Sequence, residues 1–293
     1  MKNIRVQVAS DLHEEFTRGS VVPLQIAGDV LVLAGDIHTS PEGFVAFLRR
    51  LKPTIPVIYV LGNHDYYGRG VVWETAVADY RRAIAEAGFS QVHLLEDSSV
   101  EIHGVRFLGS TLWTGFGTTT ALVTAENNVA DFTEIVRESN TPAPSKVTCP
   151  PGYVPSRQET LAFLHHAGVP RIAKQSITGR DVKLRYEGSR AWLFNALSLE
   201  FDGPTVVVTH FAPSVRSNPV EYAMSRLTRY FCNTLDNAIR ELGEHAPELW
   251  IHGHTHGIDE YTIGEKTLVV SNQRGYPGER DTFDPVGGWD IAV

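Results

Sequence analysis

Short apolar runs that end in polar, ionisable residues constrain the fold of this chain more than any other feature of its sequence. Two of them, VLVLAG at residues 30–35 and VIYVLG at residues 57–62, are rich in β-branched and other apolar side chains. Such runs are typical of central strands in a sheet that is covered on both faces. The stretches at 43–52 and 72–87 have the amphipathic spacing of helices. The first third of the chain therefore has the alternation of an α/β fold.

The same alternation returns towards the C-terminus. TVVVTH (205–210) and LWIHGH (249–254) predict strands, residues 231–242 predict a helix, and YTIG with KTLVVSN predicts a hairpin. Earlier in the chain, VEIHGVRFLGS (100–110) predicts two short strands around a turn. The strands of the fold are thus expected to come from both ends of the chain.

The middle of the chain has a different composition. Helical patterns cover residues 125–138, 157–167 and 190–199. Residues 141–155, in contrast, contain five prolines, which exclude a regular helix or a central strand. We therefore expect a single domain over residues 1–293, with residues 112–202 inserted into it as a helical, Pro-rich cap.

Composition and charge exclude several classes of protein. The chain is 42% hydrophobic and 20% charged, which is typical of a globular protein, and no apolar run is long enough to cross a bilayer. The N-terminal segment lacks the apolar stretch of a secretory signal, so we expect a cytoplasmic protein without a membrane partner. A net charge of -8 disfavours binding to nucleic acid, so we do not expect a nucleic-acid partner. The sequence carries no signal for an oligomeric state.

Five short motifs containing Asp, Asn and His stand at the ends of the apolar runs. They are Asp11-Leu12-His13, Gly35-Asp36, Gly62-Asn63-His64-Asp65, Thr209-His210 and Gly253-His254-Thr255-His256. Ligands of open α/β sheets bind at the carboxyl ends of the strands, so we expect these side chains to converge. Oxygen and imidazole ligands suit manganese, iron or zinc. The sequence therefore predicts a metal site at this edge of the fold.

In this order, the five motifs resemble those of the calcineurin-like metallophosphoesterase superfamily, from the N-terminus to His256. The resemblance implies a four-layer α/β/β/α sandwich and a centre of two divalent or mixed-valence metal ions, with manganese or iron favoured and zinc as an alternative. It implies that Asp36 bridges the ions. The implied ligands are Asp11, His13, Asp36 and His256 for one ion, and Asp36, Asn63, His210 and His254 for the other.

The implied centre suits a phosphate substrate. Two divalent ions carry more positive charge than Asp11 and Asp36 neutralise, so the centre should attract an anion. Such a pair lowers the pKa of a shared water and provides a bridging hydroxide as nucleophile near neutral pH. The resemblance assigns no metal to His64, which we expect to donate a proton to the leaving oxygen while Asp65 orients its ring.

These expectations predict metal-dependent hydrolysis of phosphoric esters, with phosphodiesterase-like activity on a small substrate favoured. A phosphomonoesterase or a protein phosphatase is an alternative within the same class. A catalytically silent metal-binding scaffold is an alternative from another class, but His64 and every predicted ligand are present. Arg274 and Tyr276 are candidate phosphate or leaving-group contacts, although the turn residues beside them allow a purely structural role.

Overall fold

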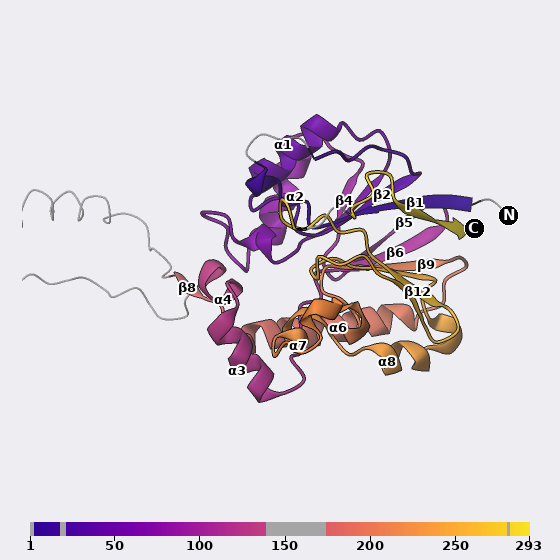
Figure 1. Ribbon diagram of the computed structural model, residues 1–293. Helices are drawn as coiled ribbons and strands as arrows, with labels where there is room; N and C mark the ends of the chain where they lie inside the picture. The colour runs from indigo at the N-terminus through magenta and orange to yellow at the C-terminus, as the bar shows by residue number, and fades with distance from the viewer. Residues whose placement is uncertain (1–2, 18–21, 139–173, 280–281) are drawn as a thin grey trace, which may run out of the picture.

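A computed structural model describes residues 3–17, 22–138, 174–279 and 282–293. In these ranges the chain forms two large sheets that pack face to face, with helices on the outer side of each (Figure 1). The predicted helix at 157–167 and the Pro-rich connection at 141–155 lie outside the described residues. Among the described residues, no helix combines the length and apolarity needed to span a bilayer.

The first sheet contains the N-terminal strands and the last strand of the chain, in the order β13-β1-β2-β3-β4. The strands are β1 (Asn3–Ala9), β2 (Val30–Ala34), β3 (Val57–Val60), β4 (Val92–Leu94) and β13 (Gly288–Ala292). The first four are parallel, and β13 pairs antiparallel with β1, which brings the two termini together (Figure 1). The helices α1 (Pro41–Leu51) and α2 (Ala76–Glu86) cover its outer face.

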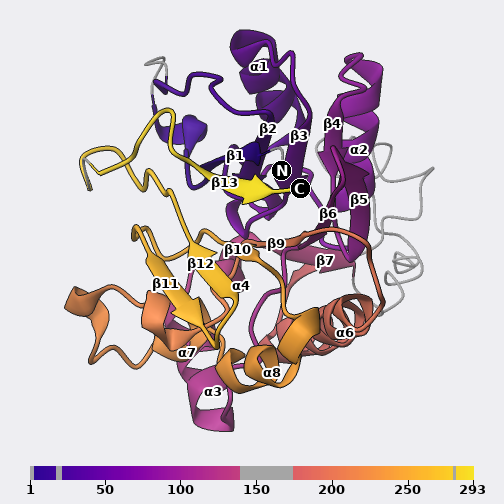
Figure 2. The same ribbon diagram turned by 90° about the vertical axis from the view of Figure 1, so that its right-hand side faces the viewer.

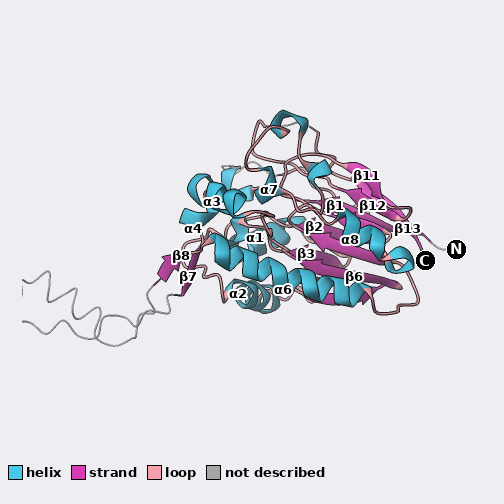
Figure 3. Ribbon diagram, turned by 90° about the horizontal axis from the view of Figure 1, so that it is seen from below, coloured by secondary structure: helices cyan, strands magenta, loops and turns pink. Residues whose placement is uncertain are grey.

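The second sheet has the order β11-β12-β10-β9-β6-β5. Its strands are β5 (Ser98–Ile102), β6 (Val105–Ser110), β9 (Thr205–Thr209), β10 (Leu249–Ile251), β11 (Glu260–Ile263) and β12 (Thr267–Val270). The four inner strands are parallel, and β11 with β12 forms the predicted antiparallel hairpin. The helices α6 (Gly179–Leu197) and α8 (Asp236–Glu241) lie along its outer face (Figures 2 and 3).

Alternating side chains on the strands build the layers. In β2, Val30 and Val32 pack between the two sheets, whereas Leu31 faces the helices of the first sheet. In β9, Val206 likewise lies between the sheets and Val207 lies under the helices of the second sheet. Both faces of each central strand are therefore buried, which explains why the runs are apolar throughout. The predicted α/β/β/α sandwich is confirmed.

Part of the prediction for the middle of the chain was wrong. Instead of one helix over residues 125–138, the structure has α3 (Thr119–Asn128), α4 (Asp131–Glu134) and the strand β7 (Val136–Glu138). Strand β7 pairs with β8 (Lys174–Ser176) in a separate two-stranded sheet. The extended backbone of Val129 and Ile135 ends the two short helices. Helical periodicity did not reveal these breaks.

Helix α6 and the segment before α8 also differ from the prediction. Helix α6 begins at Gly179 because Thr178 and Asp181 form a capping box there, well before the predicted start at residue 190. The predicted helix at 231–242 is divided into α7 (Thr228–Phe231) and α8, since Cys232 is extended and forms an isolated bridge with Ala212.

Short 3-10 helices occupy several of the connections. They are η1 (Glu14–Phe16), η2 (His64–Tyr66), η3 (Val215–Ser217), η4 (Val220–Tyr222) and η5 (Gly243–His245). Two of these, η1 and η2, follow directly after predicted metal ligands at the ends of β1 and β3. The carboxyl ends of the parallel strands in both sheets thus carry the polar motifs.

The layer between the sheets should provide much of the stability. Ile58 of β3 is fully buried there, so Ile58→Ala should lower the free energy of unfolding in urea by about 2–5 kcal/mol. The control is Leu184→Ala in α6, a side chain that is 57% exposed and should change stability by about 0.5 kcal/mol or less. Equal losses for the two variants would contradict the placement of this core.

Candidate metal centre

The backbone at the strand ends adopts an uncommon conformation. Five of the seven predicted ligands have positive φ angles, namely Asp11 (53°), His13 (46°), Asp36 (55°), His254 (75°) and His256 (52°). For residues other than glycine this conformation costs free energy, and it concentrates at functional sites. The positive φ angles of these five residues therefore indicate a functional site at the strand ends.

Two glycines allow the loops to approach one another closely. A Cβ atom on Gly62 would overlap the carboxylate of Asp36, and one on Gly35 would overlap the ring of His210. Gly35 also has a φ of 91°, which other residues rarely adopt. The loops after β2 and β3 and the end of β9 can therefore converge because these positions carry no side chain.

The structure brings all seven predicted ligands together. Their ligand atoms form overlapping groups, each with all its atoms within 4.8 Å of one another. The groups are Asp11 with His13 and His256, Asp36 with His210 and His254, and His13 with Asp36 and His64. Asn63 joins the second group, since its Oδ1 lies 3.0 Å from Nε2 of His210.

Asp36 lies between the two sets of predicted ligands. Its Oδ2 is 3.4 Å from Nε2 of His210 and 3.9 Å from Nε2 of His13. Its other oxygen, Oδ1, accepts a hydrogen bond of 2.8 Å from the backbone N–H of His64. Burial alone would raise the pKa of Asp36, but the nearby histidines outweigh it and hold that pKa well below its usual value. One ionised oxygen therefore faces both sets.

The side-chain atoms of the first set of predicted ligands are arranged as the ligands of a cation would be. Nδ1 of His13 donates to Glu15 at 3.0 Å, and Nδ1 of His256 donates to Glu279 at 2.6 Å. With Nδ1 as the donor, Nε2 of each neutral ring carries a lone pair. These two Nε2 atoms face each other at 3.1 Å. Oδ1 of Asp11 lies 3.5 Å from Nε2 of His256. Three electron-pair donors thus share a space that a cation fits.

The second set has the same character. Nδ1 of His210 donates to the carbonyl of Ala34 at 2.8 Å, which points Nε2 of that ring at Oδ1 of Asn63. Asn63 is held in this orientation because its Nδ2 donates to Asp131 at 3.0 Å. Nε2 of His254 is buried, and the described residues give it no hydrogen-bond partner. A cation would satisfy all three inward-facing atoms, so the residues fit a second metal ion.

The field at the site favours positive charge. Burial would lower the pKa of His210, but the charge of Asp36 outweighs it and raises that pKa to about 9. Burial, together with the charge of His210, holds the pKa of His254 well below its usual value. A proton on His210 and a metal cation therefore compete for the position beside the Asp36 carboxylate. Metal affinity should consequently fall at low pH.

Asp131 is a site residue that the sequence did not reveal. It is fully buried at the start of α4 and accepts hydrogen bonds from the amide of Asn63 and from the hydroxyls of Tyr67 and Tyr230. Burial raises its pKa, and these hydrogen bonds oppose the effect. Asp131 lies in a stretch predicted as one continuous helix, and it belongs to no motif that would have distinguished it.

The predicted role of Asp65 needs correction. Its Oδ2 accepts hydrogen bonds from the backbone N–H groups of Gly62 at 2.7 Å and Asp36 at 2.9 Å, and its Oδ1 accepts from the hydroxyl of Tyr59. In the part of the chain that the structure describes, Asp65 makes no hydrogen bond to the ring of His64. It therefore holds the loops of the site together and does not orient the histidine.

Glu15 and Tyr276 contact the ring of His64 instead. Oε1 of Glu15 lies 3.5 Å from Nδ1, and the hydroxyl of Tyr276 lies 3.1 Å from Nε2. The ring also stacks on Tyr67, with centroids 4.3 Å apart. Burial would raise the pKa of Glu15, but its contacts with His13 and His64 lower it to about 2. An ionised carboxylate thus stands beside His64.

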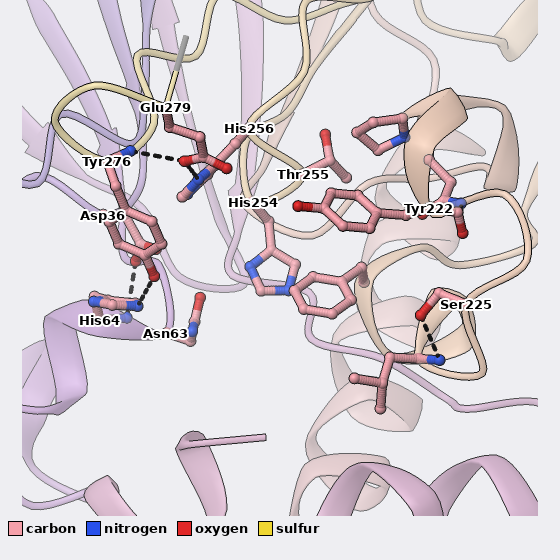
Figure 4. Close-up of a pocket in the computed structure, with 14 residues that line it drawn as sticks. Asp36, Asn63, His64, Tyr222, Ser225, His254, Thr255, His256, Tyr276 and Glu279 are labelled. Carbon is pink, nitrogen blue, oxygen red and sulfur yellow. Dashed lines mark hydrogen bonds and ion pairs between the residues drawn. The ribbon is translucent and has the colours of Figure 1, made fainter. Parts of the chain in front are cut away.

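The site opens into a cavity of about 320 Å³. Figure 4 shows Asp36, His64 and Asn63 on one side, His254 in the middle, and Tyr222 with Ser225 on the other side. The lining residues are Asp36, Asn63, His64, Asn218, Pro219, Tyr222, Ser225, Leu227, Phe231, His254, Thr255, His256, Tyr276 and Glu279. Among the described residues, the wall comes from 218–231 and not from 112–202, so a cap formed by 112–202 stays a prediction.

Of the two candidate contacts near the C-terminus, the structure places one at the site. Tyr276 lines the cavity, and its ring lies 4.5 Å from that of His13 and 4.6 Å from that of His256. Arg274 is not among the lining residues, and its guanidinium donates to the carbonyl of Leu12 at 2.8 Å.

Comparison with known proteins identifies the family. Residues 4–257 match the model of the calcineurin-like phosphoesterases. The chain belongs to this family. It is 23% identical over 273 residues to an uncharacterised protein of Acanthamoeba polyphaga mimivirus, and the match covers 89% of this chain and 83% of the relative.

One solved structure supports this fold. The phosphopantetheinyl hydrolase of Mycobacterium tuberculosis is 18% identical, with a TM-score of 0.57 and coverage of 93% of this chain and 90% of that one. A dimetal phosphatase of Danio rerio is 11% identical, with a TM-score of 0.48 and coverage of 93% and 88%. The predicted family is confirmed, and it implies a phosphoesterase with divalent metal ions at the clustered His and Asp side chains.

Metal binding tests the role of Asp131 in this calcineurin-like phosphoesterase. Asp131→Asn keeps the size of the side chain but replaces an acceptor of three hydrogen bonds, so Asn63 should lose its fixed orientation. We expect one manganese ion to bind about 10- to 100-fold more weakly while the other is unaffected, as measured by calorimetry and metal analysis. The control is Asp290→Asn, on an exposed side chain of β13. Two ions bound with unchanged affinity would contradict this role.

Proposed function

We propose that this protein hydrolyses small phosphate esters, with phosphodiesterase-like activity, at a centre of two cations. The observation that carries the proposal is the position of Asp36, which has one oxygen facing both sets of inward-pointing donors at the base of a cavity. The proposed ligands are Asp11, His13, Asp36 and His256 for one cation, and Asp36, Asn63, His210 and His254 for the other. Manganese or iron is the proposed metal, with zinc as the alternative.

The chain's own residues prepare this site for an anion. When bound, two divalent cations lower the pKa of a water and offset the charge on the phosphoryl oxygens. The ring orientations of His13, His210 and His256 direct Nε2 of each ring inward, and imidazoles are neutral as metal ligands, so these three residues add no negative charge. Asp11 and Asp36 are the carboxylates of the proposed ligand sets, and together they neutralise half of the charge of two divalent ions.

His64 is the proposed general acid. It lines the cavity beside Asp36 and belongs to neither proposed ligand set. Glu15, near Nδ1, stabilises the protonated ring, which leaves the proton on Nε2 free to be donated. Nε2 reaches the hydroxyl of Tyr276 at 3.1 Å, and a leaving oxygen in the cavity would take the place of that hydroxyl. Asp65 is a positioning residue, since its contacts are with the loops.

The charges around the cavity support a diester. No Lys or Arg occurs among the described residues that line it. A phosphomonoester carries a charge of about -1.5 to -2 at pH 7, whereas a diester has one acidic oxygen fewer. The smaller charge needs fewer cationic partners beyond the metal centre. The wall formed by 218–231 supports a small substrate, because it faces the proposed ligands across the cavity.

Two model esters test the proposed activity. Purified protein loaded with manganese should hydrolyse bis-nitrophenyl phosphate with a higher kcat/KM than nitrophenyl phosphate. Metal bound at both sites without turnover of either ester would contradict the enzyme and support a scaffold. Turnover with a clear preference for the monoester would contradict the diesterase preference.

A variant tests the role of His64. His64→Ala should keep both metal ions but lower turnover of an unactivated alkyl phosphate ester by about 100- to 10,000-fold, since a general acid is lost. The loss should be smaller for a nitrophenyl ester, because nitrophenolate leaves without protonation. The control is His245→Ala, on an exposed residue of η5. Equal rates for the variant and the wild type on the alkyl ester would remove His64 from the mechanism.

A further inference from the structure

A loop over residues 213–231 forms the cavity wall that faces the proposed metal ligands. Its ends meet, since Ala212 and Cys232 form an isolated β-bridge. The first part of the loop is anchored by the buried Ser217, whose hydroxyl lies 2.9 Å from Nε2 of His252 and 2.8 Å from the hydroxyl of Tyr261. The loop is thus tied to the second sheet, and the wall exists before a substrate binds.

The side of this loop that lines the cavity is mostly apolar. Its apolar and aromatic lining residues, which we call the apolar wall, are Pro219, Tyr222, Leu227 and Phe231. The ring of Phe231 stacks on the ring of His254, with centroids 4.9 Å apart and an angle of 29°. The apolar wall therefore begins directly beside the proposed metal centre and extends to the half-exposed Tyr222 at its rim (Figure 4).

Among the described residues, the cavity lining offers no Lys or Arg side chain to a second anionic group of a substrate. Its charged lining residues in the described part of the chain are the carboxylates Asp36 and Glu279 and the histidines at the centre. An anionic group placed against the apolar wall would lose its hydration without gaining a cationic partner, and such desolvation is unfavourable. Apolar groups, in contrast, gain free energy from burial there.

We propose that the apolar wall selects phosphate esters whose alcohol part is apolar and carries no second anionic group. This inference rests on the proposed phosphoesterase function and adds the substrate class to it. Esters of this class bind with the phosphate at the metal centre and the apolar group on the wall. Nucleoside polyphosphates and esters of carboxylated alcohols bind poorly, because the described lining residues offer no Lys or Arg side chain to their additional charges.

Three diesters with a common leaving group test the proposal. We would compare methyl, benzyl and 4-carboxybenzyl nitrophenyl phosphates with the manganese-loaded full chain. The reactive bond stays the same, and only the second ester group changes. The benzyl ester should have a kcat/KM about tenfold or more above that of the carboxybenzyl ester, in line with discrimination by a shaped pocket.

A charge placed on the wall should reduce or abolish this preference. Tyr222→Lys adds a cation to the apolar wall, so the ratio of kcat/KM for the carboxybenzyl and benzyl esters should rise by about tenfold. The control is Met224→Lys, which adds the same charge to the same loop at a side chain that is 96% exposed and does not line the cavity. It should change the ratio by about twofold or less, because solvent and salt screen the charge.

The outcomes separate the inference from the function on which it rests. If the wild type hydrolyses none of the three esters, the proposed function is wrong. If it hydrolyses the methyl ester but does not prefer the benzyl over the carboxybenzyl ester, the function stands and the inference is overturned. An equal change of the ratio in Tyr222→Lys and Met224→Lys would also overturn it. Circular dichroism of both variants shows that each is folded, and Met224→Lys should also keep the turnover of the methyl ester.

Discussion

The contact on which the rest of the site depends is that of the Asp36 carboxylate with histidines from two sheets. His13 follows β1 in the first sheet, whereas His210 follows β9 in the second, and Oδ2 of Asp36 faces both. This carboxylate is almost completely buried. Its charge is stabilised by the surrounding imidazoles and by the backbone N–H of His64, and it creates the field in which cations are favoured. The packing of one sheet on the other is therefore also the assembly of the site.

A surrounding layer of polar contacts gives each donor a defined orientation. Carboxylates or a carbonyl accept from the outer nitrogen of three histidines, so the inner nitrogens face the other predicted ligands. Asp131 does the same for the amide of Asn63, and Asp65 joins the backbones of the two loops that carry Asp36 and Asn63. Without these contacts the same residues could cluster yet present the wrong atoms.

The sequence predicted the layers and the clustering of the candidate ligands well, because both depend on local patterns. Apolar runs identify buried strands, and the polar residues directly after Ala34 or Val60 must then lie at one edge. The sequence did not reveal the residues that orient the predicted ligands, such as Glu15, Glu279 and Asp131, because their roles depend on which loops meet in space. The same reason explains the wrong role for Asp65: sequence adjacency to His64 suggested a contact, whereas its side chain faces the backbone. Residues 218–231, which form the cavity wall, contain no sequence motif that would have placed them at the site.

Anomalous diffraction from crystals grown with manganese tests the central claim most directly. The account requires two manganese peaks, one on each side of the Asp36 carboxylate, with His13 and His256 at one peak and His210 and His254 at the other. A single peak, or two peaks of which neither contacts Asp36, would contradict it.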